Sequence, residues 1–76
     1  MKFAKLFDLE NDVQVLLTIE YKEKDDTYEM VCRTDIEGCI AQIAHGYKTE
    51  ELAVKNMEKF SIEQAITFRE TMSAMF

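Results

Sequence analysis

Hydrophobic and polar residues alternate clearly over residues 13–21 of the chain, VQVLLTIEY. A period of two places successive side chains on opposite faces of a strand, so this pattern predicts a half-buried β-strand. The predicted inner face carries Val13, Val15, Leu17, Ile19 and Tyr21. The predicted outer face carries Gln14, Leu16, Thr18 and Glu20. We expect Leu17 to be a core residue.

Two later segments alternate in the same way, and a weaker alternation precedes the first. In the segment 28–35 the inner residues are Tyr28, Met30, Cys32 and Thr34, and the outer ones are Glu29, Val31, Arg33 and Asp35. In the segment 39–47 the inner residues are Cys39, Ala41, Ile43, His45 and Tyr47, and the outer ones are Ile40, Gln42 and Ala44. Near the N-terminus, Phe3, Lys5, Phe7 and Leu9 share a face. The patterns predict four strands, with Ile43 as a second core residue.

Three short loops connect these segments, at residues 10–12, at Asp25 and Asp26, and around Glu37 and Gly38. The resulting pairs are Leu9–Val13 and Phe7–Val15, then Tyr21–Met30 and Ile19–Cys32, then Cys32–Ile43. Every pair joins two inner residues, and a slip of one residue would turn a whole apolar row to water. The loops therefore predict a four-stranded antiparallel meander.

After residue 47 the period changes to that of a helix. Thr49 is a good N-cap, and two glutamates follow it in the first turn. The stripe of Leu52, Ala53, Met57 and Phe60 loses its phase at Ser61. Because Ser61 and Gln64 match a capping box, we predict two helices, 50–59 and 62–75, with one bent helix as the alternative. The whole chain, residues 1–76, is predicted to be a single α+β domain with both helices packed on one face of the sheet.

The 76 residues carry a formal net charge of −6. This sign disfavours direct binding to nucleic acid or to an anionic membrane, and no apolar run reaches the length of a membrane span. A negative net charge favours binding to a basic protein, or to a protein that binds nucleic acid, although acidic residues can also serve solubility alone. The predicted partner-binding residues lie around the second hairpin: Glu23, Asp25, Asp26 and Glu29. An acidic residue already appears at Asp8, which is unlike a signal peptide. We therefore expect a cytoplasmic protein.

The residues that could carry chemistry are few. Cys32 and Cys39 are not opposite each other in the predicted register, so we expect buried thiols rather than a disulfide. The single histidine, His45, is predicted to lie at the edge of the core. Neither serine, Ser61 or Ser73, has a motif that would activate it. We therefore predict no catalytic residue, no metal site and no cofactor, and a protein that is not an enzyme.

The C-terminal segment, FSIEQAITFRETMSAMF, is more apolar than one sheet requires. On a helical wheel its apolar residues span about half the circumference, whereas a helix on one sheet needs a stripe of roughly 100°. Arg69 falls inside that arc. Either it extends over the first helix, or the arc is a homodimer interface in which Arg69 pairs with a carboxylate. The predicted interface is Phe68, Arg69, Met72 and Phe76, and the alternative on the outer sheet face is Leu16, Val31 and Ile40.

Two short stretches carry a resemblance to a known family. The chain opens with MKFAK, and Thr49-Glu50-Glu51-Leu52 opens the helix after the fourth strand. With the order of four strands and two helices, the chain resembles the small phage-encoded anti-CRISPR proteins that block type I-F surveillance complexes. The resemblance implies a phage or mobile-element origin and a non-enzymatic inhibitor that binds a basic surface of a nucleic-acid-binding complex. The alternative function is a homo-oligomeric accessory protein.

Overall fold

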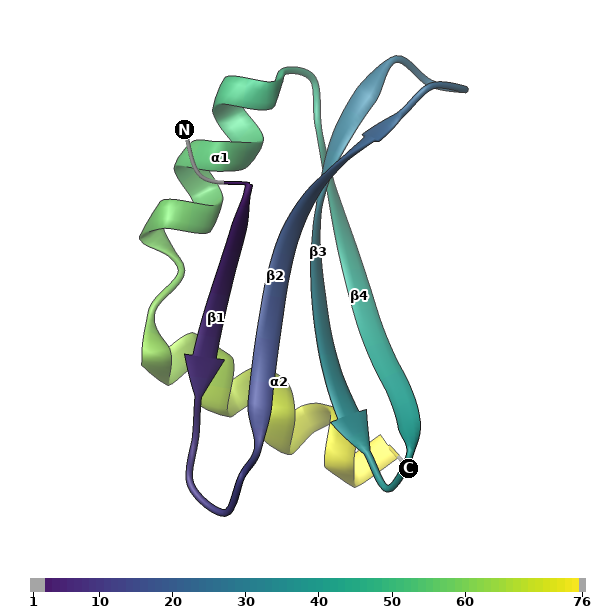
Figure 1. The fold of residues 1–76 in the computed structure, drawn as a ribbon. Helices are drawn as coiled ribbons and strands as arrows, with labels where there is room; N and C mark the ends of the chain where they lie inside the picture. Colours follow the sequence, from purple (N-terminus) through teal and green to yellow (C-terminus); the bar gives the residue numbers. More distant parts are fainter. Residues whose placement is uncertain (1–2, 76) are drawn as a thin grey trace.

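The computed structural model describes residues 3–75, which form one sheet and two helices (Figure 1). The elements are β1 (Ala4–Asp8), β2 (Gln14–Lys22), β3 (Thr27–Ile36), β4 (Cys39–Tyr47), α1 (Glu50–Lys59) and α2 (Ile62–Met75). The strands are antiparallel and lie side by side in sequence order, and both helices cover the same face of the sheet. The predicted α+β meander with two helices is confirmed. We call the face that carries the helices the inner face and the opposite one the outer face.

The first and third connections have the predicted register. Phe7 pairs with Val15 across the first hairpin, and Cys32 pairs with Ile43 across the third. The turn at residues 37–38 has φ angles of 52° and 87°. Two positive φ angles in succession are the geometry of a type I′ hairpin turn, and glycine adopts the second of them without strain.

The second connection is longer than predicted, and its predicted register is wrong. The observed pairs are Ile19–Met30 and Tyr21–Tyr28. The loop contains four residues, 23–26, instead of the two aspartates alone, because only Asp26 adopts the positive φ that a two-residue turn needs twice. The shift is two residues, so each side chain keeps its predicted face.

The core lies between the inner face and the helices. Its fully buried members with the largest side chains are Leu17, Met57, Val15 and Cys32. The remaining buried members of this cluster are Met30, Ile36, Ala41, Ala65, Phe68 and Met72. Leu17 has 0% of its surface exposed, which confirms its predicted place in the core.

The helix boundaries follow from local capping. The Thr49 side chain accepts a hydrogen bond from the Leu52 N–H at 3.2 Å and begins α1. Phe60 leaves the helical conformation, with ψ at 120°. The Ser61 N–H donates to Gln64 Oε1 at 2.9 Å, and the Gln64 N–H donates to Ser61 Oγ at 3.2 Å. This reciprocal pair is a capping box, so the prediction of two separate helices is confirmed.

The helices leave the inner side of β4 partly open, and several predictions of burial are wrong there. Ile43 is 37% exposed, and His45 and Cys39 are also exposed. The pattern identified the face of these residues correctly, but the helices lie mainly over β2 and β3. On α1, Leu52 is 46% exposed and Val54 is buried in its place.

Candidate interaction surfaces

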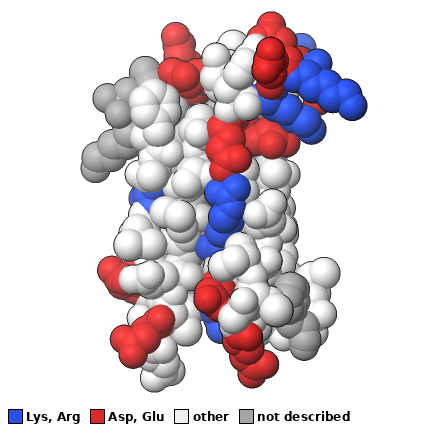
Figure 2. All heavy atoms as spheres, turned by 45° about the vertical axis from the view of Figure 1, so that its right-hand side comes forward, with Lys and Arg blue, Asp and Glu red and all other residues white. Residues whose placement is uncertain are grey.

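Neither helix covers the outer sheet face. Figure 2 shows it as mostly uncharged, with a narrow column of charged side chains along its middle. Leu6 on β1 is 52% exposed and Ile40 on β4 is 59% exposed, with the half-buried Leu16 on β2. These three side chains and Arg33 line one open pocket of about 460 Å³. The outer face therefore offers exposed apolar side chains around a central cation.

Arg33 organises the middle of this face. Its guanidinium contacts Glu20 Oε2 at 2.7 Å and donates to Thr18 Oγ1 at 2.9 Å and Gln42 Oε1 at 3.1 Å. The hydrogen bond from Arg33, together with one from Thr18, holds the pKa of the Glu20 carboxyl below its usual value. The pairing of Arg33 with Glu20 crosses the row that contains Val31, and Val31 is only 2% exposed. Val31 therefore cannot contribute to a docking surface on this face, contrary to the sequence-based prediction.

Arg69 is directed at the chain's own sheet. Its guanidinium donates to Thr34 Oγ1 at 3.0 Å and to the Asp35 carbonyl, and the Thr34 hydroxyl donates to the Gln14 carbonyl at 2.9 Å. These bonds join α2 to β2 and β3 at the place where the β2–β3 pairing ends, with Val15 opposite Thr34. The predicted alternatives for Arg69, over α1 or across a dimer interface, are replaced by this contact within one chain.

Two other members of the predicted helix interface, Phe68 and Met72, are buried in the core of the chain. Phe68 is 9% exposed and Met72 is 5% exposed, and both belong to the core cluster. Phe76 lies outside the described residues. On α2, Ile62 and Ile66 remain exposed. Because the chain's own sheet covers Phe68 and Met72, an interface centred on them would require them to leave the core.

The predicted acidic cluster at the β2–β3 hairpin is partly neutralised. Lys22 lies 3.4 Å from Asp25 and 3.9 Å from Glu29. Asp26 accepts a hydrogen bond from the Tyr21 hydroxyl at 2.8 Å, which raises the pKa of that tyrosine. Glu23 is exposed, and no ion pair to it is recorded within residues 3–75. A basic partner would meet a mixed surface at this hairpin.

A second group of acids lies at the opposite end of the sheet, where the β1–β2 loop, the β3–β4 turn and α2 are found (Figure 1). Asp8, Glu10 and Glu70 line one open pocket beside Arg69. Asp12 and Asp35 line the neighbouring pocket, which continues onto the outer face. Together with Glu37 in the β3–β4 turn, we call these residues the acidic end: Asp8, Glu10, Asp12, Asp35, Glu37 and Glu70. The predicted sites did not include it, because its members come from three segments that are distant in sequence: residues 8–12, residues 35–37 and Glu70.

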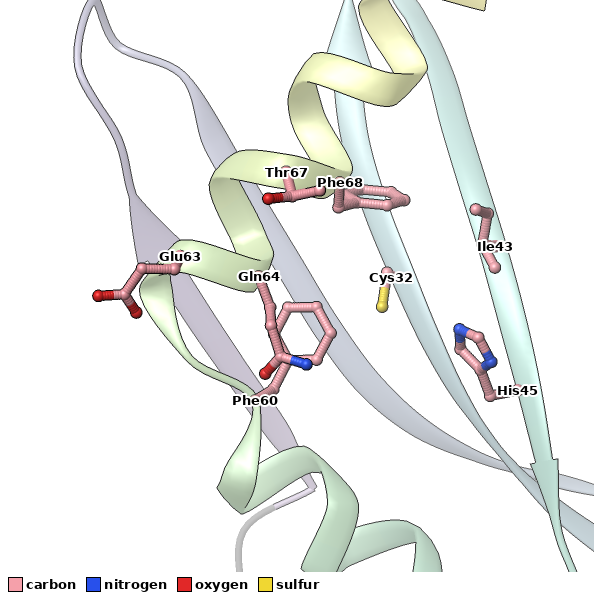
Figure 3. Close-up of a pocket in the computed structure, with 8 residues that line it drawn as sticks. All are labelled: Cys32, Ile43, His45, Phe60, Glu63, Gln64, Thr67 and Phe68. Atoms are coloured by element: carbon pink, nitrogen blue, oxygen red, sulfur yellow. The ribbon is translucent and has the colours of Figure 1, made fainter.

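A groove follows the open inner side of β4 and has a volume of about 360 Å³. In Figure 3, Ile43 and His45 lie on one side, Phe60, Gln64 and Phe68 on the other, and Cys32 lies between them. Burial raises the pKa of the Cys32 thiol, whereas a catalytic cysteine requires a lowered pKa. The groove thus brings a cysteine and a histidine together without the electrostatics of a nucleophile.

The two cysteines should differ strongly in reactivity. Cys39 is exposed and Cys32 is 2% exposed, and they are not bonded to each other. We expect a thiol reagent to modify one equivalent per native chain at once and the second only after denaturation. Cys39→Ser should remove the fast phase. Rapid modification of Cys32 in the native protein would contradict the burial of its side chain in the core.

Comparison of the chain with protein families, curated proteins and solved structures found no match. No helix within residues 3–75 is long and apolar enough to cross a membrane. In the same described part of the chain, no group of three or more His, Cys, Asp or Glu side chains is arranged to hold a metal ion.

Proposed function

We propose that this chain is a non-enzymatic protein-interaction domain that binds a basic partner through its outer sheet face and the adjoining acidic end. The observation that carries the proposal is the exposure of Leu6 and Ile40 on a sheet face that neither helix covers. Exposed apolar side chains on such a face favour contact with another molecule. The pocket that contains both residues also contains Asp12 and Asp35, so apolar and acidic groups share one surface.

The charges define the kind of partner. Acidic side chains near an apolar patch accelerate and orient the approach of a basic surface, while the apolar contacts slow dissociation. Proteins that hold nucleic acid present such basic surfaces. The net charge of −6 and the family resemblance support a narrower proposal: a cytoplasmic inhibitor of phage or mobile-element origin that occludes a nucleic-acid-binding complex.

The proposal is tested by capture from a lysate of the native host with three tagged proteins: wild type, Leu6→Ser and Leu52→Ser. Leu52 is the matched control, because it is 46% exposed but lies on α1. We expect one dominant basic protein that wild type and the control capture, with affinity reduced about tenfold or more by Leu6→Ser. Binding of that purified protein should weaken as salt rises, and less steeply for a variant with Asp12→Asn and Glu37→Gln. If Leu6→Ser and the Asp12→Asn, Glu37→Gln variant bound the partner as tightly as wild type and the Leu52→Ser control, neither the outer face nor the acidic end would be the binding surface.

A further inference from the structure

The two edges of the sheet differ in how they are protected. β1 is short, and its Lys5 points inward and bonds to carbonyls at the end of α1. Short edge strands and inward-pointing lysines are devices that prevent edge-to-edge pairing. β4 has nine residues, all of them paired with β3 without a bulge, and lies within the uncharged run of residues 38–47. Within residues 3–75 no strand pairs with its other side, as Figure 1 shows.

The register of the β3–β4 hairpin identifies the free backbone groups. The residues that flank its two-residue turn, Ile36 and Cys39, form a hydrogen-bonded pair, and such pairs alternate along an antiparallel ladder. Every second residue of β4 therefore directs its N–H and C=O away from β3. These residues are Ile40, Gln42, Ala44 and Gly46. They present a regular row of donors and acceptors to whatever lies beside β4.

We propose that two copies of the chain pair through β4 in antiparallel orientation, with Ile43 opposite Ile43 of the second copy. In this register every outward-directed residue meets another: Ile40 meets Gly46, and Gln42 meets Ala44, in both directions. The result is a continuous sheet through both copies. The pairing uses the edge of β4 and leaves the outer face of each copy open, so it is independent of the proposed function.

The side chains fit this register. Ile40 is 59% exposed, and a Cβ built on Gly46 would have no atom within 4 Å, so the larger side chain lies over open space. Ala41 is opposite His45, which again pairs a small residue with a large one. Ile43, 37% exposed in the single chain, contacts its counterpart where non-hydrogen-bonded residues approach closely. The grooves beside β4 in the two copies then lie next to each other.

Electrostatics favour self-association through the β4 edge over self-association through other surfaces of the chain. Each copy has a formal net charge of −6, so two copies repel wherever their acids face each other. The uncharged run 38–47 allows backbone contact without placing like charges opposite one another. The self-complementary order of small and large side chains distinguishes a second copy from an unrelated extended peptide.

The first test compares Ala44→Pro with Ala44→Thr by sedimentation equilibrium from low micromolar to millimolar concentration. Proline removes an N–H that β3 does not use, and edge strands tolerate it there, whereas its ring would clash with a paired strand. We expect wild type and Ala44→Thr to approach twice the monomer mass of 8.9 kDa. Ala44→Pro should keep the native circular dichroism and raise the dimer dissociation constant at least about tenfold. A folded Ala44→Pro that still dimerises, or a wild type that stays monomeric throughout, would overturn the proposal.

The second test fixes the register and does not depend on a proline variant that folds. In a Cys32→Ala and Cys39→Ser background, which removes the native thiol opposite residue 43 on β3, Ile43→Cys places one thiol of each copy in a non-hydrogen-bonded pair, whose Cα atoms lie about 4.5 Å apart, within disulfide range. Gln42→Cys is the control, because its counterpart lies diagonally across and beyond the roughly 7 Å limit. With oxidised glutathione, Ile43→Cys should form a covalent dimer at least about tenfold faster than Gln42→Cys. Equal rates, or no covalent dimer for Ile43→Cys, would contradict the proposed register.

Discussion

Replacement of Leu17 by alanine is expected to lower the free energy of unfolding by about 2–5 kcal/mol. Leu17 lies in the middle of β2, between Lys5 of β1 and Cys32 of β3, and has no exposed surface. The truncation removes buried methyl groups and leaves a cavity that its rigid neighbours fill only in part. A domain of this size has a total stability of roughly 5–15 kcal/mol, so the variant would approach its limit. Denaturant unfolding followed by circular dichroism measures the change.

Leu52→Ala is the control for this experiment. Leu52 is also an apolar residue of a regular element, but its side chain is 46% exposed. Its truncation should change the stability by no more than about 0.5 kcal/mol. If Leu17→Ala cost less than about 1 kcal/mol, β2 would face the other way and the register of the sheet would be wrong.

Local signals predicted the elements well. The capping residues Thr49 and Ser61 act within one turn of chain, so the helix boundaries 50–59 and 62–75 agree with α1 and α2. The alternation in residues 13–21 identified β2 and its inner face because a strand has a strict period of two. The length of the β2–β3 loop was predicted wrongly, because loops of two and four residues both keep the inner residues opposite one another and alternation cannot distinguish them. The choice depends on the backbone angles at Asp25 and Asp26, and only Asp26 has the positive φ.

Burial was predicted less well because it depends on where the helices lie. The alternation places Ile43 on the same face as Leu17, yet α1 and α2 lie mainly over β2 and β3 and leave Ile43 partly exposed. The opposite error occurs at Val31 on the outer face. The pairing of Arg33 with Glu20 passes over Val31 and buries it. The alternation of polar and apolar residues does not predict where a long side chain such as that of Arg33 extends.

The candidate site was the least predictable part, because it is assembled from distant segments. The acidic residues around positions 23–29 were predicted to bind a partner because they are close in sequence, but Lys22 is paired with two of them. The acidic end comes from the end of β1 and the β1–β2 loop, from the end of β3 and the β3–β4 turn, and from Glu70 of α2. These segments meet only in the folded chain. Arg69 illustrates the same limit. Its place in an apolar arc was visible, but its hydrogen bond to Thr34 spans 35 residues of sequence.

A long-range contact of the same kind leads to the second large expected effect. Lys5 Nζ donates to the carbonyls of Phe60 at 2.7 Å and Glu58 at 3.1 Å, and lies 5.1 Å from the centroid of the Phe7 ring. The last carbonyls of a helix lack partners within the helix and carry its negative dipole end. Lys5→Met keeps the length of the side chain and removes the charge and the donors. We expect the free energy of unfolding to fall by about 1.5–3 kcal/mol.

Lys55→Met is the matched control. Lys55 lies on α1, the helix whose end Lys5 contacts, but its side chain is exposed. This substitution should change the free energy of unfolding by no more than about 0.5 kcal/mol. Denaturant melts at low and at molar salt separate the two contributions of Lys5. Salt screens the attraction to the helix dipole but leaves the short hydrogen bonds of this half-buried side chain largely in place. The difference between wild type and Lys5→Met should therefore shrink at high salt without vanishing. A difference below about 0.5 kcal/mol at low salt would mean that Lys5 does not connect β1 to the end of α1, because a surface lysine alone has an effect of that size.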